Sequence, residues 1–228
     1  MSRGSSEARG GGRPAFVIGV LVSGSGTNLQ AILDAVGNGQ LGAKVGVVIS
    51  NVPTAKALDR AKASHVPAIV VDHKAFPSRG AFDAAIVEVL QAHNVDCVVL
   101  AGFMRIVTKT VLDAFPNRVV NVHPALLPAF PGLHAQRQAL EYGVAVSGCT
   151  VHFVDAGTDT GPIIAQAPVP VLDSDDEESL VARILQKEHE LLPLVLQWIA
   201  DGRVSVVQPE KGRSRVNVRP WSPPPETL

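Results

Sequence analysis

The sequence predicts an α/β protein with a doubly wound, mostly parallel sheet and an antiparallel extension in its C-terminal part. Short apolar runs rich in Val and Ile barely alternate with polar residues, which is typical of strands buried on both faces. Helical patterns separate these runs, as in a parallel α/β sheet. After residue 132 the pattern becomes more alternating, which favours antiparallel strands.

The N-terminal part is expected to alternate between parallel strands and helices. The predicted strands are "FVIGVLV" (16–22), "KVGVVIS" (44–50), "VPAIVV" (66–71), "VDCVVLA" (95–101) and "RVVNV" (118–122). The predicted helices are 28–36, 54–64 with a cap at Thr54, and 78–94 with a cap at Ser78. This alternation predicts a doubly wound parallel sheet.

The C-terminal part is expected to add two strands and a long helix. "VAVSGCTVHFV" (144–154) and "GPIIAQAPVPV" (161–171) predict an antiparallel pair around a glycine-rich turn. In the helix that follows, Ser174 and Glu177 match a capping box. Pro193 is expected to kink this helix and Gly202 to end it.

Length and composition favour one domain, or at most one and a half. The chain has 228 residues, of which 46% are hydrophobic, so it can bury a full core. A net charge of -1 and 4% aromatic residues give no basis for binding nucleic acid or an anionic membrane. No apolar run is long enough to span a bilayer. We expect a disordered leader (1–15), one domain (16–208) and an irregular tail (209–228).

The two cysteines indicate a reducing compartment. Cys97 lies in an apolar run and is expected in the core, and Cys149 is far from it in sequence. Two isolated cysteines suggest no disulfide framework and cannot form a zinc site. No His/Cys cluster with metal-ligand spacing occurs, so we expect no metal and a cytoplasmic location.

The loop "VSGSGTNLQ" (22–30) predicts an anion site between the first strand and the first helix. Gly24 and Gly26 would present backbone N–H groups at a helix N-terminus. Leu29 stands where a dinucleotide fingerprint has its third glycine, and Asn51 where it has an acidic residue. A single phosphate of a small metabolite fits better, and a tight turn without ligand is the alternative.

Asn121 and His123 come at the carboxyl end of a predicted parallel strand, where ligands of open α/β sheets bind. Strand geometry places both side chains on one face. An amide and an imidazole together can stabilise an oxyanion and relay a proton. Pro124 and Pro128 restrict the loop behind them. The alternative is a turn-capping asparagine beside a buried core histidine.

The loop "DAGTDTGPI" (155–163) offers a carboxylate, Asp155 or Asp159, that could orient a histidine. A turn aspartate bonded to its own backbone is the alternative. His134 and His152 flank this region and are candidates for supporting roles. In the late helix, the pattern alone predicts that Glu188 and His189 lie on a solvated face.

Several stretches taken together resemble the folate-dependent formyltransferases over about residues 16–208. The matching stretches are "VLVSGSGTNLQAI", "VVLAGFMRI", "NVHPALLPAFPG", "HAQRQALEYG", "GCTVHFVDAGTDTGPII" and "QKEHELLPLVLQWIADGR". The nearest branch formylates 5-phosphoribosylglycinamide in de novo purine biosynthesis. The resemblance implies transfer of the formyl group of 10-formyltetrahydrofolate to the substrate amine through a tetrahedral oxyanion intermediate, without a metal.

The resemblance also implies residue roles. Its catalytic residues fall on Asn121, His123 and Asp159, and Asp159 would keep His123 protonated. Its residues for the amine substrate fall on Gly26, Thr27, Asn28 and Glu188, so Glu188 would bind ribose hydroxyls instead of facing solvent. Its folate-binding residues fall on Arg79, Met104, Arg105, Ile106, Val107, Asn121, Asp155, Ala156, Gly157, Thr158 and Asp159. Residues 16–117 would be the phosphate-binding half, and residues 118–208 the catalytic and folate-binding half.

Three alternatives share the predicted sheet. Methionyl-tRNA formyltransferases carry an additional C-terminal domain, whereas a helix and a tail are expected here after residue 172. Formyltetrahydrofolate hydrolases carry an N-terminal regulatory domain, whereas the first strand is expected at Phe16. A non-catalytic nucleotide-binding module would not need an amide, an imidazole and a carboxylate together. The expected partners are two small molecules, and the sequence leaves open a homodimer.

Overall fold

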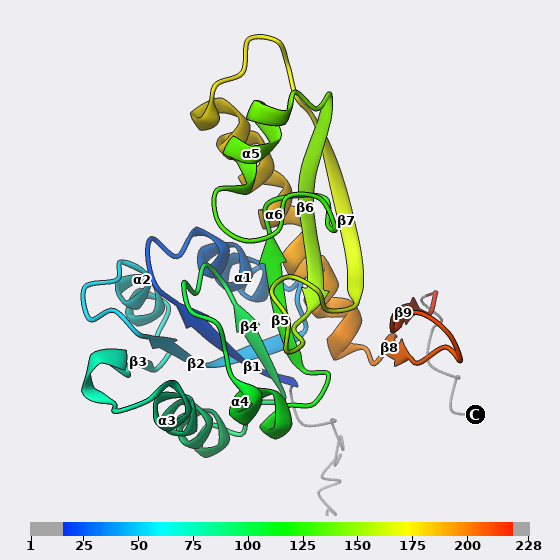
Figure 1. Ribbon diagram of the computed structural model, residues 1–228. Coiled ribbons are helices and arrows are strands. Elements are labelled where there is room, and N and C mark those ends of the chain that lie inside the picture. The colour runs from blue at the N-terminus through cyan, green and yellow to red at the C-terminus, as the bar shows by residue number, and fades with distance from the viewer. Residues whose placement is uncertain (1–15, 221–228) are drawn as a thin grey trace, which may run out of the picture.

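The computed structural model in Figure 1 describes residues 16–220. The predicted leader (1–15) and the last part of the predicted tail (221–228) lie outside the described residues. Within 16–220, two layers of helices cover a central twisted sheet, and a small hairpin follows the last helix (Figure 1).

The central sheet has seven strands in the order β3-β2-β1-β4-β5-β6-β7. The strands are β1 Phe16–Val22, β2 Ala43–Ser50, β3 Ala68–Val70, β4 Cys97–Leu100, β5 Val119–His123, β6 Val146–Phe153 and β7 Ile163–Pro170. Neighbouring strands from β3 to β5 pair in parallel, whereas β6 pairs antiparallel with both β5 and β7. The predicted fold class is therefore confirmed, including its antiparallel extension.

Helices cover both faces of the sheet. They are α1 Thr27–Gly37, α2 Ala57–Ala63, the 3-10 helix η1 His73–Ala75, α3 Arg79–Ala92, α4 Lys109–Ala114, α5 Ala135–Tyr142 and α6 Glu177–Ala200. In β5, Val120 packs in the core layer of α1 and α6, and Val119 packs in the layer of α3. Because both faces are covered, successive strand residues are apolar. Within residues 16–220, no helix combines the length and apolarity that crossing a membrane requires.

The predicted helix starts are confirmed in one case and wrong in two. Ser78 caps α3 by accepting the Ala81 N–H at 3.1 Å, as predicted. Thr54 does not cap α2, which begins after Lys56 without a side-chain cap. The capping box of α6 is formed by Asp176 and Ser179, not by Ser174 and Glu177.

The later start of α6 follows from the turn that precedes it. The carboxylate of Asp175 accepts the Leu172 N–H at 2.8 Å and two N–H groups of Arg183 at 2.6 and 2.8 Å. These bonds hold Ser174 and Asp175 in the turn, so Asp176 is left to cap the helix. The helix continues through Pro193 and ends at Ala200, and Gly202 follows in the left-handed region with φ 67°.

The tail was predicted to be irregular from residue 209, and this prediction is wrong for part of it. β8 (Val204–Val207) and β9 (Arg215–Val218) form an antiparallel hairpin. Alternate valines of both strands pack against the core layer of α1 and α6. Strands of four residues with two inward-facing side chains each give too weak a periodic signal to be detected in sequence.

The carboxyl ends of the parallel strands form the edge that carries the candidate site. The chain leaves β1 and β4 in opposite directions along the sheet, so a crevice opens between the loops that follow them. These two loops are joined, since Ser23 N–H donates to the Gly102 carbonyl at 3.1 Å and Met104 N–H donates to Ser23 Oγ at 2.8 Å. The neighbouring strand β5 ends at the same edge with His123.

Candidate active site

Four polar side chains lie on one face of the sheet where β5 pairs with β6. Asn121 is opposite His152, and His123 is opposite Thr150. Their strand neighbours Val120, Val122, Val151 and Phe153 point the other way, into the core layer of α1 and α6. The structure therefore brings Asn121 and His123 together on one face, as the strand alternation predicted.

The imidazole of His123 is fixed through both nitrogens. The side chain is almost completely buried, with 4% exposure. Nε2 lies 2.8 Å from the Phe130 carbonyl oxygen, which can only accept, so Nε2 carries a hydrogen. Nδ1 lies 3.4 Å from Oδ2 of Asp159, and this contact is favourable when Nδ1 also carries a hydrogen. The arrangement therefore suits an imidazolium held between a carbonyl and a carboxylate.

Asp159 connects the loop between β6 and β7 to the end of β5. Its backbone is left-handed with φ 54°, and its Oδ2 accepts the Gly132 N–H at 2.7 Å. Asp155 behaves differently, because its Oδ1 accepts the Gly157 N–H at 3.0 Å and the Thr160 hydroxyl at 2.6 Å. The alternative of a turn aspartate thus describes Asp155, whereas Asp159 faces the histidines.

His152 has a supporting position beside the Asn121 amide. Its Nδ1 lies 2.8 Å from the Phe153 carbonyl oxygen and therefore carries the hydrogen. Its Nε2 is then free to accept from Asn121 Nδ2 at 3.2 Å. Burial lowers the pKa of His152, which favours this neutral form. His152 thus orients the Asn121 amide.

A second polar pair lies between α1 and α6. Asn28 Nδ2 donates to Glu188 Oε2 at 2.8 Å, and Glu188 is only 6% exposed. Burial raises the pKa of Glu188, and the bond from Asn28 opposes this effect. The pattern-based prediction of a solvated face at Glu188 is wrong, because this side of α6 packs on α1. The Oδ1 atom of Asn28 is buried without a partner in residues 16–220.

The loop before α1 has the geometry predicted for an anion site. Gly26 has φ 73°, and a Cβ atom there would lie 2.6 Å from Ala57 Cβ, so only glycine fits. The helix begins at the next residue, Thr27, and its first backbone bond runs from Gln30 N–H to the Gly26 carbonyl at 2.9 Å. The N–H groups before Gln30 remain available to an anion.

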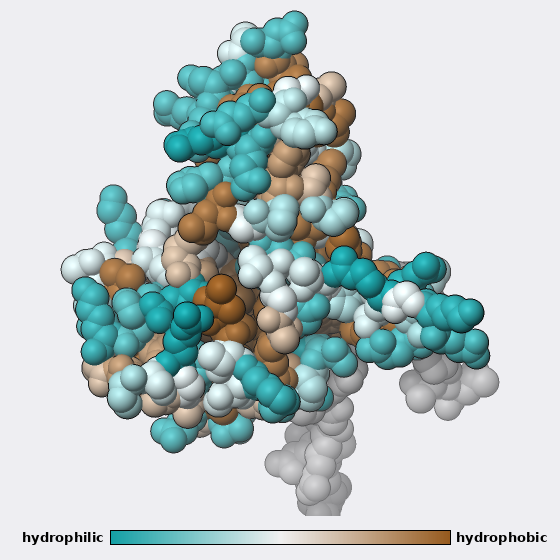
Figure 2. Space-filling model, in the orientation of Figure 1, coloured by the Kyte–Doolittle hydropathy of each residue, from teal (hydrophilic) through white to brown (hydrophobic). Residues whose placement is uncertain are grey.

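The loop after β4 exposes apolar side chains beside the crevice. Met104 and Ile106 are 68% and 59% exposed, and Figure 2 shows apolar residues gathered in the middle of this face. Val107 does not share this exposure, because its side chain packs in the core layer of α3. Val107 can therefore line a folate site only through its backbone.

Two arginines expected in the folate site lie on or beside α3. The Arg105 guanidinium is 5.5 Å from the centre of the Phe82 ring on this helix. Arg79 is exposed and is the first residue of α3, three residues before Phe82.

No sequence pattern indicated which side chain holds the loop after β5. Thr150 is fully buried, and its hydroxyl donates to the Ala125 carbonyl at 2.7 Å. The same oxygen accepts the Leu127 N–H and the Gln166 side-chain amide, both at 3.0 Å. A threonine within a strand is ordinary, so only the fold reveals this role.

In residues 16–220 no group of three or more His, Cys, Asp or Glu side chains could hold a metal ion.

Comparisons with known proteins agree with this geometry. The family model described as "Formyl transferase" matches residues 17–196. A phosphoribosylglycinamide formyltransferase of Mycobacterium tuberculosis is 50% identical over 194 residues, covering 85% of this chain and 89% of that protein. The solved structure of glycinamide ribonucleotide transformylase 1 from Symbiobacterium toebii is 55% identical, with a TM-score of 0.87, covering 90% of this chain and 95% of that one.

Some relatives are much longer. The trifunctional purine biosynthetic protein adenosine-3 of Drosophila melanogaster is 48% identical over 195 residues, which cover 85% of this chain. The chain spans only 14% of that relative's length.

Proposed function

This chain belongs to the formyl transferase family, and we propose that it transfers the formyl group of 10-formyltetrahydrofolate to the amine of 5-phosphoribosylglycinamide. The observation that carries the proposal is the convergence of Asn121, His123 and Asp159 at the carboxyl end of β5. A role in purine biosynthesis and a cytoplasmic location belong to the same proposal. Two relatives of similar length are named for this transfer.

Formyl transfer requires stabilisation of an oxyanion. The amine nitrogen attacks the formyl carbon, a C–N bond forms, and the carbonyl oxygen becomes negative. Asn121 Nδ2 and the His123 imidazolium would donate hydrogen bonds to this oxygen. The bond to the folate nitrogen then breaks, and that nitrogen takes up a proton while the new amide loses one. Asp159 would stabilise the charge on His123 throughout.

The His123 contact with Phe130 sets a condition on this chemistry. In the structure, His123 Nε2 donates to the Phe130 carbonyl at 2.8 Å, and its Nδ1 faces Asp159. No N–H of the ring is left for an oxyanion in this arrangement. The Phe130 carbonyl must therefore leave Nε2 when the substrates bind, which requires a shift of the loop 124–134.

The two substrates would bind on opposite sides of Asn121 and His123. The backbone N–H groups of Gly26, Thr27 and Asn28 suit the substrate phosphate, and Glu188 suits the ribose hydroxyls. The exposed side chains of Met104 and Ile106 suit the apolar rings of the folate. The cations Arg79 and Arg105 suit its carboxylates, and residues 155–159 would close the folate site.

The proposal is tested by giving the purified protein 10-formyltetrahydrofolate with and without 5-phosphoribosylglycinamide and following tetrahydrofolate release. Release that depends on the amine supports it. Equal release without the amine would identify a hydrolase. A third mixture contains methionyl-tRNA in place of the amine substrate, and release only in that mixture would identify the tRNA-modifying branch. A folded protein that gives no release in any of these mixtures would contradict a formyltransferase function.

A further inference from the structure

The hydroxyl of Ser23 joins the ends of three strands at the edge of the sheet that carries the candidate site. Ser23 is the first residue after β1, Asn51 is the first residue after β2, and Met104 lies in the loop after β4. Ser23 Oγ donates to Asn51 Oδ1 at 2.6 Å and accepts the Met104 N–H at 2.8 Å. The chemistry described above uses neither Ser23 nor Asn51.

Asn51 sets the direction of the bond between Ser23 and Met104. A hydroxyl carries one hydrogen, and the amide oxygen of Asn51 takes it, so a lone pair of Ser23 Oγ is left for the Met104 N–H. Asn51 is only 4% exposed, and His73 Nδ1 lies 3.2 Å from its backbone carbonyl oxygen. The position where a dinucleotide-binding fold has a ribose-binding carboxylate thus holds an internal hydrogen bond here.

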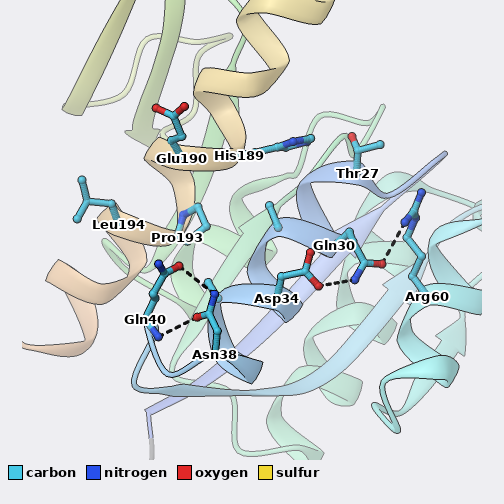
Figure 3. A pocket seen from close by; sticks show the side chains of 12 residues that line it. Thr27, Gln30, Asp34, Asn38, Gln40, Arg60, His189, Glu190, Pro193 and Leu194 are labelled. Carbon is cyan, nitrogen blue, oxygen red and sulfur yellow. Dashed lines mark hydrogen bonds between the residues drawn. The ribbon is translucent and has the colours of Figure 1, made fainter.

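The loop that carries Ser23 is itself firmly held. The Ser23 N–H donates to the Gly102 carbonyl at 3.1 Å. Further along the loop, Arg60 Nε donates to the Ser25 carbonyl at 2.8 Å, and Arg60 Nη1 donates to Gln30 Oε1 at 3.0 Å, the bond drawn between these two side chains in Figure 3. Ser23 therefore offers its hydroxyl to the neighbouring loop from a fixed position.

The loop after β4 depends on such contacts because part of it faces solvent. The side chains of Met104 and Ile106 are 68% and 59% exposed, so packing does little to hold them. The far end of the loop is held by Asp83, which is 1% exposed and accepts the Thr108 N–H. At the near end, the Met104 backbone is held by the Ser23 hydroxyl. Loss of this hydroxyl would free the Met104 end of the loop.

We propose that Ser23, oriented by Asn51, is a positioning residue of the folate site. Its hydroxyl would hold the Met104 backbone so that the side chains of Met104 and Ile106 are already placed for the apolar rings of the folate. This inference rests on the proposed function and adds Ser23 and Asn51 to the residues on which folate binding depends. A loop that must be ordered when the ligand binds costs affinity, and a loop held in place avoids that cost.

The test measures the Kd of tetrahydrofolate by isothermal titration calorimetry with the intact chain. Ser23→Ala should raise this Kd about five- to tenfold, because one hydrogen bond of the loop is lost. The KM for 10-formyltetrahydrofolate should rise by a similar factor while kcat stays within about threefold, since the folate rings are held alike before and during transfer. The KM for the amine substrate should change less than about twofold.

Rescue and coupling identify the hydroxyl as the cause. Ser23→Thr keeps the hydroxyl, and its Kd for tetrahydrofolate should stay within about twofold of wild type. Asn51→Ala should weaken folate binding in the wild-type background. In the Ser23→Ala background the same change should add less than about twofold, because Asn51 acts through Ser23.

The matched control is Ser50→Ala, at the end of the neighbouring strand. The Ser50 hydroxyl is buried, and it donates to the Val52 carbonyl at 2.8 Å and accepts the Val52 N–H at 3.1 Å. This variant loses a hydroxyl at the same sheet edge and should change the Kd for tetrahydrofolate less than about twofold. Hydrogen exchange of the Met104 amide, followed by NMR without ligand, should be faster in Ser23→Ala and unchanged in Ser50→Ala.

Two results would overturn the inference. One is a Kd for tetrahydrofolate in Ser23→Ala that equals the wild-type value. The other is an equal loss of affinity for both substrates in Ser23→Ala, which would indicate general damage to the structure. If Ser23→Ala does not fold, Ser23→Cys takes its place with the same expected rise, because a thiol of similar shape is a weak hydrogen-bonding group.

The binding measurement separates this inference from the proposed function. Tetrahydrofolate binding that depends on the Ser23 hydroxyl, in a protein without formyl transfer, supports the inference and contradicts the function. Formyl transfer by a protein whose folate affinity is the same with and without that hydroxyl supports the function and overturns the inference.

Discussion

Oδ2 of Asp159 lies 3.4 Å from Nδ1 of His123 and also accepts the Gly132 N–H at 2.7 Å. One carboxylate oxygen thus joins the end of β5, the loop that follows it and the loop between β6 and β7. Its other oxygen, Oδ1, lies 3.8 Å from Nε2 of His152, beyond hydrogen-bond distance, which fits a neutral His152 whose Nε2 accepts from Asn121. In the proposed mechanism Asp159 is therefore the charge partner of His123.

Asp159→Asn should lower kcat roughly 10²- to 10⁴-fold, because the amide cannot stabilise an imidazolium at His123. The fold should be retained, since the Asn oxygen can still accept the Gly132 N–H. Asp155→Asn is the matched control in the same loop; as a residue proposed for the folate site it should raise the KM for the folate, and its kcat at saturating folate should stay within about threefold of wild type. Steady-state kinetics of both variants check this, and equal losses would remove the special role of Asp159.

The free energy of unfolding should fall as the pH is lowered below about 6.5. Burial lowers the folded-state pKa of His152 and of His189, so the unfolded chain binds more protons below its own histidine pKa. The stability that these two histidines contribute is complete above about pH 6.5. As the pH falls below this value, it decreases by at most about 1.4 kcal/mol per pH unit for each histidine.

Glu188 acts in the opposite direction in this titration. Its folded-state pKa is raised, so protonation at lower pH stabilises the fold. Urea unfolding should therefore be followed from pH 8 to 5 in a Glu188→Gln background, with and without His152→Gln. The free energy of unfolding should change less steeply with pH in the variant that lacks His152. Identical slopes in the two proteins would show that His152 is not the titrating group.

Glu188→Gln should raise the KM for the amine substrate about tenfold or more, because the ribose hydroxyls lose a charged acceptor. The free energy of unfolding near pH 7 should not fall, since the variant removes a buried carboxylate and still accepts from Asn28. Glu178→Gln removes an exposed charge from the same helix and should leave this KM unchanged. A large loss of stability with no change in KM would assign Glu188 to the fold alone.

Thr150→Val should destabilise the protein by about 2–4 kcal/mol, because it leaves the Leu127 N–H and the Gln166 amide without their acceptor. Thr150→Ser keeps the hydroxyl and should cost about 1 kcal/mol for the lost methyl group. The midpoints of urea unfolding measure the loss of stability in both variants. Proteolysis within 124–134 should be faster in the Val variant, and a Val variant as stable as wild type would contradict the anchoring role.

The sheet could be predicted because each parallel strand is buried on both faces and is apolar throughout. Two parallel strands were predicted too long: β4 covers Cys97–Leu100 instead of 95–101, and the edge strand β3 covers Ala68–Val70 instead of 66–71. Pro67 lacks an N–H and contributes only its carbonyl, which accepts from Val48 N–H at 2.9 Å. The short helices α4 and α5 were missed, because six and eight residues give little periodicity.

The part of the candidate site that could be predicted is the position of its polar side chains. Strand alternation alone predicts that Asn121 and His123 lie on one face of the sheet. The contacts that fix them could not be predicted, because the Phe130 carbonyl and the Gly132 N–H are backbone groups that any residue has. The role of His152 depends on the register of β6 against β5, and a slip of one residue would turn it to the other face.

The proposed mechanism is tested most directly by the amine-dependent rate of tetrahydrofolate release by His123→Ala, measured together with the Kd values of both substrates. The variant should lose at least about 10³-fold in kcat, because His123 acts mainly on the oxyanion in the transition state. Both Kd values should stay within about tenfold of wild type. A variant that turns over at the wild-type rate would contradict the assignment of His123 and, with it, the proposed mechanism.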